Sequence, residues 1–302
     1  VFKLPFVLLW TSCRIYLLPC VSYILLEISI KICCGLCLHY GLHYKDKKFP
    51  ASSASLGTVN GRSGPELDGT VDWKRAEDIL HQEYENNGGE EKNGKFQCTL
   101  FSGGVTPSDI AQGQLGDCWL LSAFACLAEF EGAVKNAFVN ASYSRYGRYR
   151  VRLYNKPQEK WETITVDDMF PCKKGSCTPM FTDPNGTELW VMVLEKAFAK
   201  FVGSYGALDG GHPLFALEAL TGDTVYKYVR QSGKWTGLSM VHKGNVPDVH
   251  NVTFAPSNAA SLTDEQMFEV FAEYDNKDSV QAAGSEGNDD TQSSGGIVKG
   301  HA

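Results

Sequence analysis

The sequence predicts an α+β fold, because two segments have the spacing of helices and a third has the alternation of a β-hairpin. An almost entirely apolar run follows Cys118 and continues to Phe130, as expected of a helix buried on most sides. Residues 149–154 and 161–166 alternate and are rich in β-forming side chains, so we expect them to pair. Apolar residues recur at helical spacing over 189–202, which predicts one more helix after the strands.

Composition divides the chain into segments with different expected roles. Residues 1–44 are hydrophobic and rich in cysteine, and residues 45–72 are expected to be a flexible linker, with Ser and Gly concentrated after residue 50. Globular patterning runs from about 71 to 274. Residues 275–296 are acidic and rich in Ser, Gly and Gln, which predicts a mobile, disordered surface loop.

The first 44 residues fit no standard targeting segment. Their longest run free of both charged residues and histidine, 15–26, is twelve residues, whereas a spanning helix needs roughly 18–20. They are also too long and too interrupted by charge for a signal peptide. Residues 1–44 could still be a membrane anchor with acylated cysteines or an extra segment that packs on the core. We favour sequence foreign to the mature protein, because the chain begins with Val1 and not Met.

Charge and cysteine usage exclude several classes of protein. The formal net charge of −7 over 302 residues argues against a nucleic-acid partner. The ten cysteines are unevenly spaced, and they form neither a disulfide framework nor a convincing zinc site. Reduced thiols indicate an intracellular, cytoplasmic protein, with membrane association through residues 1–44 left open.

Cys118 is the candidate nucleophile. It follows a predicted turn and helix cap at Gly116 and Asp117, so it lies in the first turn of the expected helix. Unpaired N–H groups and the positive end of the helix dipole favour a thiolate there. Gln112, held by a glycine-rich turn, is placed to donate to an oxyanion. The alternative is that Cys118 is simply a small buried residue, but the flanking Gln, Gly, Asp and Trp favour the nucleophile.

The run 112–127 resembles the nucleophile motif of the calpains, calcium-dependent members of the papain-like cysteine proteases. Other strings resemble the same family and follow in its order: Trp73-Lys-Arg75, 101–109, 161–171, 188–190, 194–200, 205–211 and Lys299-Gly-His301-Ala302. The resemblance covers about 73–302. Several matching strings in the family's order are more specific than any single motif.

The resemblance implies a papain-like, two-lobed protease core, with a first lobe at 73–228 and a truncated second lobe at 229–302. The implied activity is a calcium-dependent intracellular endopeptidase that cleaves proteins through a thioester acyl-enzyme. Spacing alone does not choose a base among His212, His242, His250 and His301. The resemblance chooses His301, which would take the proton of Cys118 and return it to the leaving amine.

The chain departs from the family pattern at its end. Calpains orient the histidine with a later asparagine, and this chain stops one residue after His301. We therefore expect a fragment with little activity in isolation, whose parent has further regulatory domains or a separate subunit. Its partners would be protein substrates.

The resemblance also implies calcium in the first lobe. The matching ligands are the side chains of Asp109 and Glu188 and the carbonyl groups of Ser102 and Gly104, a mixture of oxygens suited to this ion. From the residues alone, Asp109 as a helix cap and Glu188 as a solvated charge are the alternatives.

Two other functions compete with a protease. A catalytically inactive calpain-like scaffold is the first, although Cys118, Gln112 and His301 are all present. A transglutaminase-like acyltransferase is the second, and the string at 194–200 argues against it. Neither the motifs nor the composition determine the substrate.

Overall fold

The computed structural model describes residues 43–86, 96–110, 116–257, 261–284, 293–294 and 297–298. The chain divides into two units, Val1–Tyr44 and Lys45–Ala302, and the description below concerns the second. The possible membrane anchor falls outside the described residues, except for its last two. Within the described ranges, no helix has both the length and the apolar character needed to cross a membrane.

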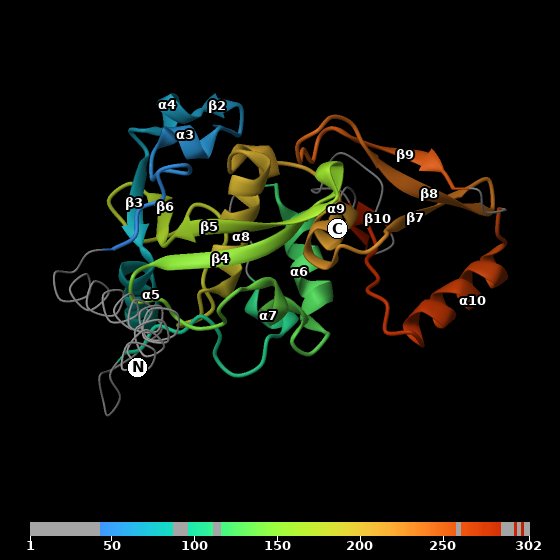
Figure 1. Ribbon diagram of the computed structural model, residues 1–302, viewed down its shortest axis with the longest axis horizontal. Helices are drawn as coiled ribbons and strands as arrows, with labels where there is room; N and C mark the ends of the chain where they lie inside the picture. The colour runs from blue at the N-terminus through green and yellow to red at the C-terminus, as the bar shows by residue number, and fades with distance from the viewer. Residues whose placement is uncertain are drawn as a thin grey trace, which may run out of the picture. The chain divides into compact units, whose positions relative to one another are not determined.

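The larger strands all pair in antiparallel fashion, as the α+β prediction requires. They form the long-range pair β3–β6, the hairpin β4–β5 and the three-stranded sheet β7–β8–β9 (Figure 1). The predicted hairpin is confirmed, with Tyr149 opposite Val166. The bounds of these strands are β3 Val71–Arg75, β4 Arg148–Asn155, β5 Lys160–Asp167, β6 Met169–Lys173, β7 Tyr226–Gln231, β8 Lys234–His242 and β9 Val252–Pro256.

Both predicted helices are present. Helix α6 spans Cys118–Ala128 and ends two residues before the apolar run does, and helix α8 spans Trp190–Val202. The other helices of at least five residues are α5 Ala76–Asn86, α7 Ala133–Ala137, α9 Pro213–Thr221 and α10 Asp264–Asp275. Short 3-10 helices are η2 Pro107–Asp109, η3 Lys156–Gln158 and η4 Gly206–Leu208.

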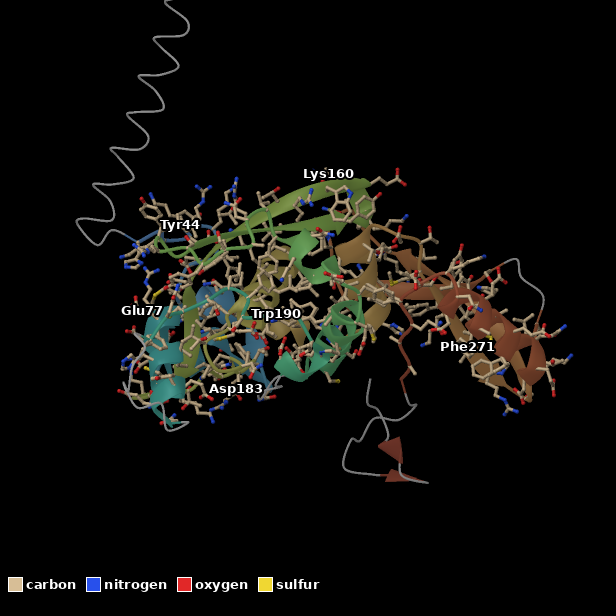
Figure 2. All side chains as sticks on the ribbon, turned by 90° about the horizontal axis from the view of Figure 1, so that it is seen from below. Tyr44, Glu77, Lys160, Asp183, Trp190 and Phe271 are labelled. Carbon is tan, nitrogen blue, oxygen red and sulfur yellow. The ribbon has the colours of Figure 1, made fainter. Side chains whose placement is uncertain are left out.

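Helix α8 forms the centre of the hydrophobic core. All of its residues except Lys200 and Val202 are buried, and it packs against the β4–β5 hairpin (Figure 1). Trp190, at its start, lies in the interior in Figure 2 and contacts the rings of Phe101 and Phe124. Packing on every side explains why this helix is apolar almost all round.

Residues 45–72 differ from the predicted flexible linker. They contain the short helices α3 (Ser53–Leu56) and α4 (Gly64–Leu67) and the strand pair β1 (Thr58–Val59) and β2 (Arg62–Ser63). Five apolar side chains of the segment belong to the core: Phe49, Leu56, Val59, Leu67 and Val71. The Ser/Gly composition misleads because a few well-spaced apolar residues are enough to fix the segment on the core.

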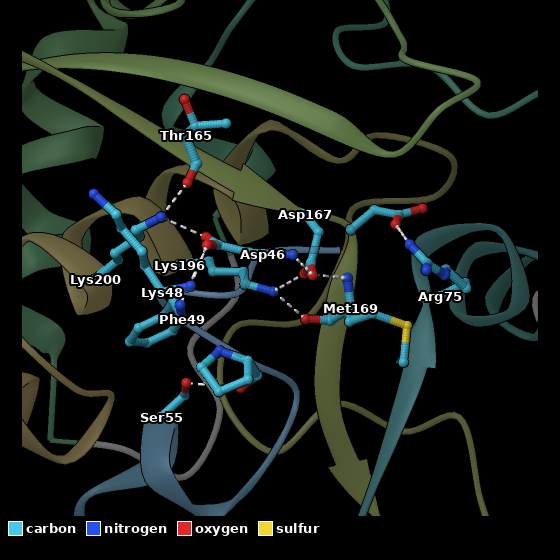
Figure 3. A network of polar contacts seen from close by, with 12 residues as sticks. Asp46, Lys48, Phe49, Ser55, Arg75, Thr165, Asp167, Met169, Lys196 and Lys200 are labelled. Atoms are coloured by element: carbon cyan, nitrogen blue, oxygen red, sulfur yellow. Dashed lines mark hydrogen bonds and ion pairs between the residues drawn. The ribbon is translucent and has the colours of Figure 1, made fainter. Parts of the chain in front are cut away.

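A buried polar network attaches the same segment to α8 (Figure 3). The side chain of Lys196 is fully buried and pairs with Asp167 at 2.5 Å. Lys200 pairs with Asp46 at 2.5 Å, and the backbone N–H of Asp46 donates to Asp167 at 2.8 Å. Because buried charges are costly unless paired, these contacts fix the position of residue 46 relative to α8.

The sheet β7–β8–β9 and helix α10 are more exposed than the region around α8. Of the residues of α10, Met267 alone is buried, and Phe271 projects outward in Figure 2. The predicted loop at 275–296 lies partly outside the described residues. Within it, residues 276–284 form neither helix nor strand, and Ser293–Ser294 (β10) pairs with Ile297–Val298 (β11).

Candidate active site

Cys118 is the first residue of α6, which confirms its predicted position in the first turn of the helix, and it is half-buried. The carbonyl oxygen of Asp117 accepts hydrogen bonds from the N–H groups of Leu120 and Leu121 at 2.8 and 3.1 Å, which begins the helix. Asp117 is the N-cap residue, as predicted, but its side chain does not cap the helix. Its carboxyl group makes no hydrogen bond to the N–H groups of the first turn and is buried in the protein.

A loop that follows α8 holds the turn at Cys118 from one side. The Nε1–H of Trp119 donates to the carbonyl of Leu208 at 2.9 Å, and the N–H of Gly210 donates to the carbonyl of Gly116 at 2.8 Å. Gly211 lies against the indole ring, where an added Cβ would come within 2.4 Å of Trp119 Cε2. These contacts explain why the string at 205–211 accompanies the string around Cys118.

Two buried carboxyl groups lie beneath the same turn. Asp117 and Glu195 are 1% and 2% exposed, and their side chains interact. Burial raises the pKa of Asp117 to about 6, and burial followed by the nearby Asp117 raises the pKa of Glu195 well above its usual range. This pair was not predicted from the sequence. The sequence did contain a signal for it, because Glu195 is an acidic residue inside the apolar helical run 189–202.

The other two predicted catalytic residues, Gln112 and His301, lie outside the described residues, so their roles remain predictions. Two of the alternative histidines have contacts of their own. Nε2 of His242 lies 2.5 Å from Glu218 Oε2, and Nδ1 of His212 accepts from the N–H of Leu214 at the start of α9. Burial lowers the pKa of His212 to about 4. His250 is exposed in a loop.

The structure brings together the two carboxylates among the four predicted calcium ligands. The carboxyl groups of Asp109 and Glu188 are each 6% exposed and interact electrostatically, and the backbone N–H of Ser102 donates to Glu188. Gly104 is exposed. Among the described residues there is no cluster of three or more His, Cys, Asp or Glu side chains suited to a metal. A site here would therefore depend on backbone oxygens as well.

The sequence left two alternative roles open, a helix cap for Asp109 and a solvated surface charge for Glu188, and the structure agrees with the first but not with the second. Asp109 does cap η2, since Oδ2 accepts from the N–H of Thr106 at 2.8 Å and Oδ1 from its hydroxyl at 3.0 Å. Glu188 is not a solvated charge: its carboxyl is buried, and burial raises its pKa, with a further increase from Asp109.

Comparison with known proteins assigns the chain to a family. The family described as calpain family cysteine protease matches residues 44–302. The calpain-type cysteine protease ADL1 of Oryza sativa subsp. japonica is 32% identical over 261 residues, which are 86% of this chain and 10% of that protein. The calpain-1 catalytic subunit of Rattus norvegicus is 34% identical over 252 residues, 76% of this chain and 33% of that protein.

Rat calpain-8 is 33% identical over 192 residues, which are 62% of this chain and 24% of calpain-8. The chain thus spans a third or less of the length of these relatives. Since the match includes the candidate nucleophile and covers the whole of the second unit, the chain belongs to the calpain family of cysteine proteases.

Proposed function

We propose that this chain is the protease core of a calcium-dependent cysteine endopeptidase with a papain-like, two-lobed fold. The observation that carries the proposal is the position of Cys118. It is a half-buried thiol at the first residue of a buried helix, in a turn held by the loop at 208–211. The boundary at about residue 228 between the lobes, a cytoplasmic location and regulatory domains elsewhere in the parent protein belong to the same proposal.

The proposed reaction begins with transfer of the Cys118 proton to His301. The sulfur then attacks the carbonyl carbon of the scissile peptide, and the oxyanion is held by the Gln112 side chain and the N–H of Cys118. That N–H is available because the first N–H groups of a helix have no partner within it. His301 returns the proton to the leaving amine, and water hydrolyses the thioester to release the acid.

The residues proposed to hold calcium have suitable chemistry. Asp109 and Glu188 place two buried carboxyl groups near each other, and the charge of Asp109 adds to burial in raising the pKa of Glu188. A divalent cation would offset this repulsion, and carboxylate and carbonyl oxygens are the ligands it prefers. Asp109 and Glu188, with the carbonyls of Ser102 and Gly104, would hold the ion. When bound, it would neutralise both carboxylates and join the residues before η2 to those before α8.

The test is mass-spectrometric labelling of Cys118 by a peptidyl epoxide, in the full-length protein, with and without millimolar calcium. We expect labelling that depends on calcium and a loss of that dependence in Asp109→Ala. Asp183→Ala is the matched control, because Asp183 is a half-buried acid five residues before Glu188 and is not among the proposed ligands. Its calcium response should be unchanged.

A different result would favour the inactive scaffold. If Cys118 of the folded protein is labelled no faster than Cys126, which lies two turns further along α6, Cys118 is not an activated nucleophile. Labelling without any calcium effect would retain the protease and remove the calcium site.

A further inference from the structure

Helix α8 places an acidic side chain directly against the turn that carries Cys118. Glu195 is 2% exposed and interacts with Asp117, the residue before Cys118. The carboxyl group of Asp117 does not cap α6, and its Oδ2 atom is buried without a hydrogen bond from any described N–H or hydroxyl group. An orphaned, buried carboxylate oxygen is costly, so this position requires a donor.

Glu195 is arranged to be that donor. Its Oε1 atom accepts two hydrogen bonds from Thr182, one from the backbone N–H at 3.1 Å and one from the hydroxyl at 2.5 Å. Both contacts use the same oxygen, which leaves Oε2 to carry a proton toward Asp117. A protonated carboxyl group has one O–H donor, and a bond from it to a carboxylate is short and strong.

We propose that Glu195 is a positioning residue for Cys118: its protonated carboxyl, oriented by Thr182, donates a hydrogen bond to Asp117 and thereby fixes the turn that presents the thiol. This inference rests on the proposed protease function. The described polar contacts of Glu195 are with Thr182 and Asp117, so it would act on Cys118 through Asp117. The loop at 208–211 holds the other side of the turn, and together the two contacts fix its backbone at both edges.

The charges around the pair favour one shared proton. Burial is the main reason that the pKa of Glu195 is raised, and Asp117 adds to the increase. Asp209 faces Asp117 and raises its pKa further, while the buried hydroxyl of Tyr205 faces Glu195. No cation is among the causes of either shift. Loss of the shared proton at alkaline pH would leave two buried carboxylates in contact, and their repulsion would loosen the turn.

The test is the rate of alkylation of Cys118 by iodoacetamide, measured from pH 5 to 10 in the full-length protein. In the wild type the rate should rise as the thiolate forms and fall again when the shared proton is lost. In Glu195→Gln the amide still donates to Asp117 but has no proton to lose, so the alkaline fall should disappear. Glu195→Ala should lower the rate roughly tenfold, the equivalent of one hydrogen bond to a charged group.

Glu218→Gln is the matched control, since Glu218 is another buried acid on a core helix but pairs with His242. Its pH profile should follow the wild type. Thermal unfolding of each variant separates loss of structure from loss of positioning, and the Glu195→Gln profile decides the question even if Glu195→Ala fails to fold.

The inference is overturned if Glu195→Gln keeps the alkaline fall, or if folded Glu195→Ala reacts like the wild type. Failure of the protease proposal has a different signature. In that case wild-type Cys118 itself reacts no faster than Cys126 and is not labelled by the peptidyl epoxide.

Discussion

Helices α8 and α10 have nearly the same length but opposite relations to the rest of the protein. Helix α8 has 13 residues and is buried almost all round, whereas α10 has 12 and buries Met267 alone. The sequence signals that start a helix are stronger in the exposed helix α10 than in the buried helix α8. Helix α10 begins with a capping box between Thr263 and Gln266 and has acidic residues in its first turn, while α8 has Leu189 at its N-cap position and no side-chain cap. Helix α10 is therefore specified by its own sequence, and α8 by its surroundings.

The largest predicted difference concerns a phenylalanine on each helix. Phe198 on α8 is fully buried and contacts the ring of Phe124, whereas Phe268 on α10 is 73% exposed. We expect Phe198→Ala to lower the free energy of unfolding by about 3–5 kcal/mol, because it leaves a cavity in the core. Phe268→Ala should change it by less than about 0.5 kcal/mol. Urea denaturation measures both, and equal losses would contradict the comparison.

A smaller effect is predicted at His212, where the core meets the exposed sheet. The ring centroids of His212 and Phe254 in β9 are 4.8 Å apart. Burial, and to a lesser extent the positive charge of Lys227, lowers the pKa of His212 to about 4. The unfolded chain binds a proton near pH 6.5 and the folded one does not. Stability should therefore rise from pH 4 to 6.5, by of order 1–3 kcal/mol given the partial burial.

The check is the free energy of unfolding as a function of pH in the wild type and His212→Gln. The variant cannot bind the proton, so this part of the slope should be lost. His250→Gln is the control, because His250 is exposed and its replacement should leave the slope in place. An unchanged slope in His212→Gln would show that the histidine ring is not shielded by Phe254.

The smallest predicted effect is in the turn between β7 and β8. Gly233 has φ of +76° and open space around it, so Gly233→Ala meets no neighbour and costs only backbone strain. That strain is about 1–2 kcal/mol for a left-handed residue with a side chain. Gly69→Ala, also in open space but without a positive φ, should cost less. Thermal melts of the two variants compare them, and a Gly69→Ala loss as large as that of Gly233→Ala would exclude the φ explanation.

The sequence predicts those elements whose residues repeat at a regular spacing. The hairpin at 149–166 and the two helices after Cys118 and Leu189 are of this kind, and all three are present. Residues 45–72 have no such repeat, because each of their buried apolar residues fills a separate position in the core. Their role depends on partners far along the chain, which a single sequence does not reveal.

The same limit applies to the candidate site. Cys118 could be predicted because the cap, the turn and the apolar helix adjoin it in sequence. The pairing of Glu195 with Asp117 joins two helices, so only the folded chain shows it. Asp109 and Glu188 were identified through a resemblance, and their interaction joins residues far apart in the sequence, so only the folded chain shows it.

The polar network at residue 46 determines where a shortened form of this protein can begin. A recombinant chain starting at Trp73, the first string of family resemblance, would lack Asp46 and leave Lys200 without its carboxylate partner. It would also lose Phe49 and Leu56 from the core. The smallest piece expected to fold therefore starts before Asp46, close to the first residue of the family match at 44.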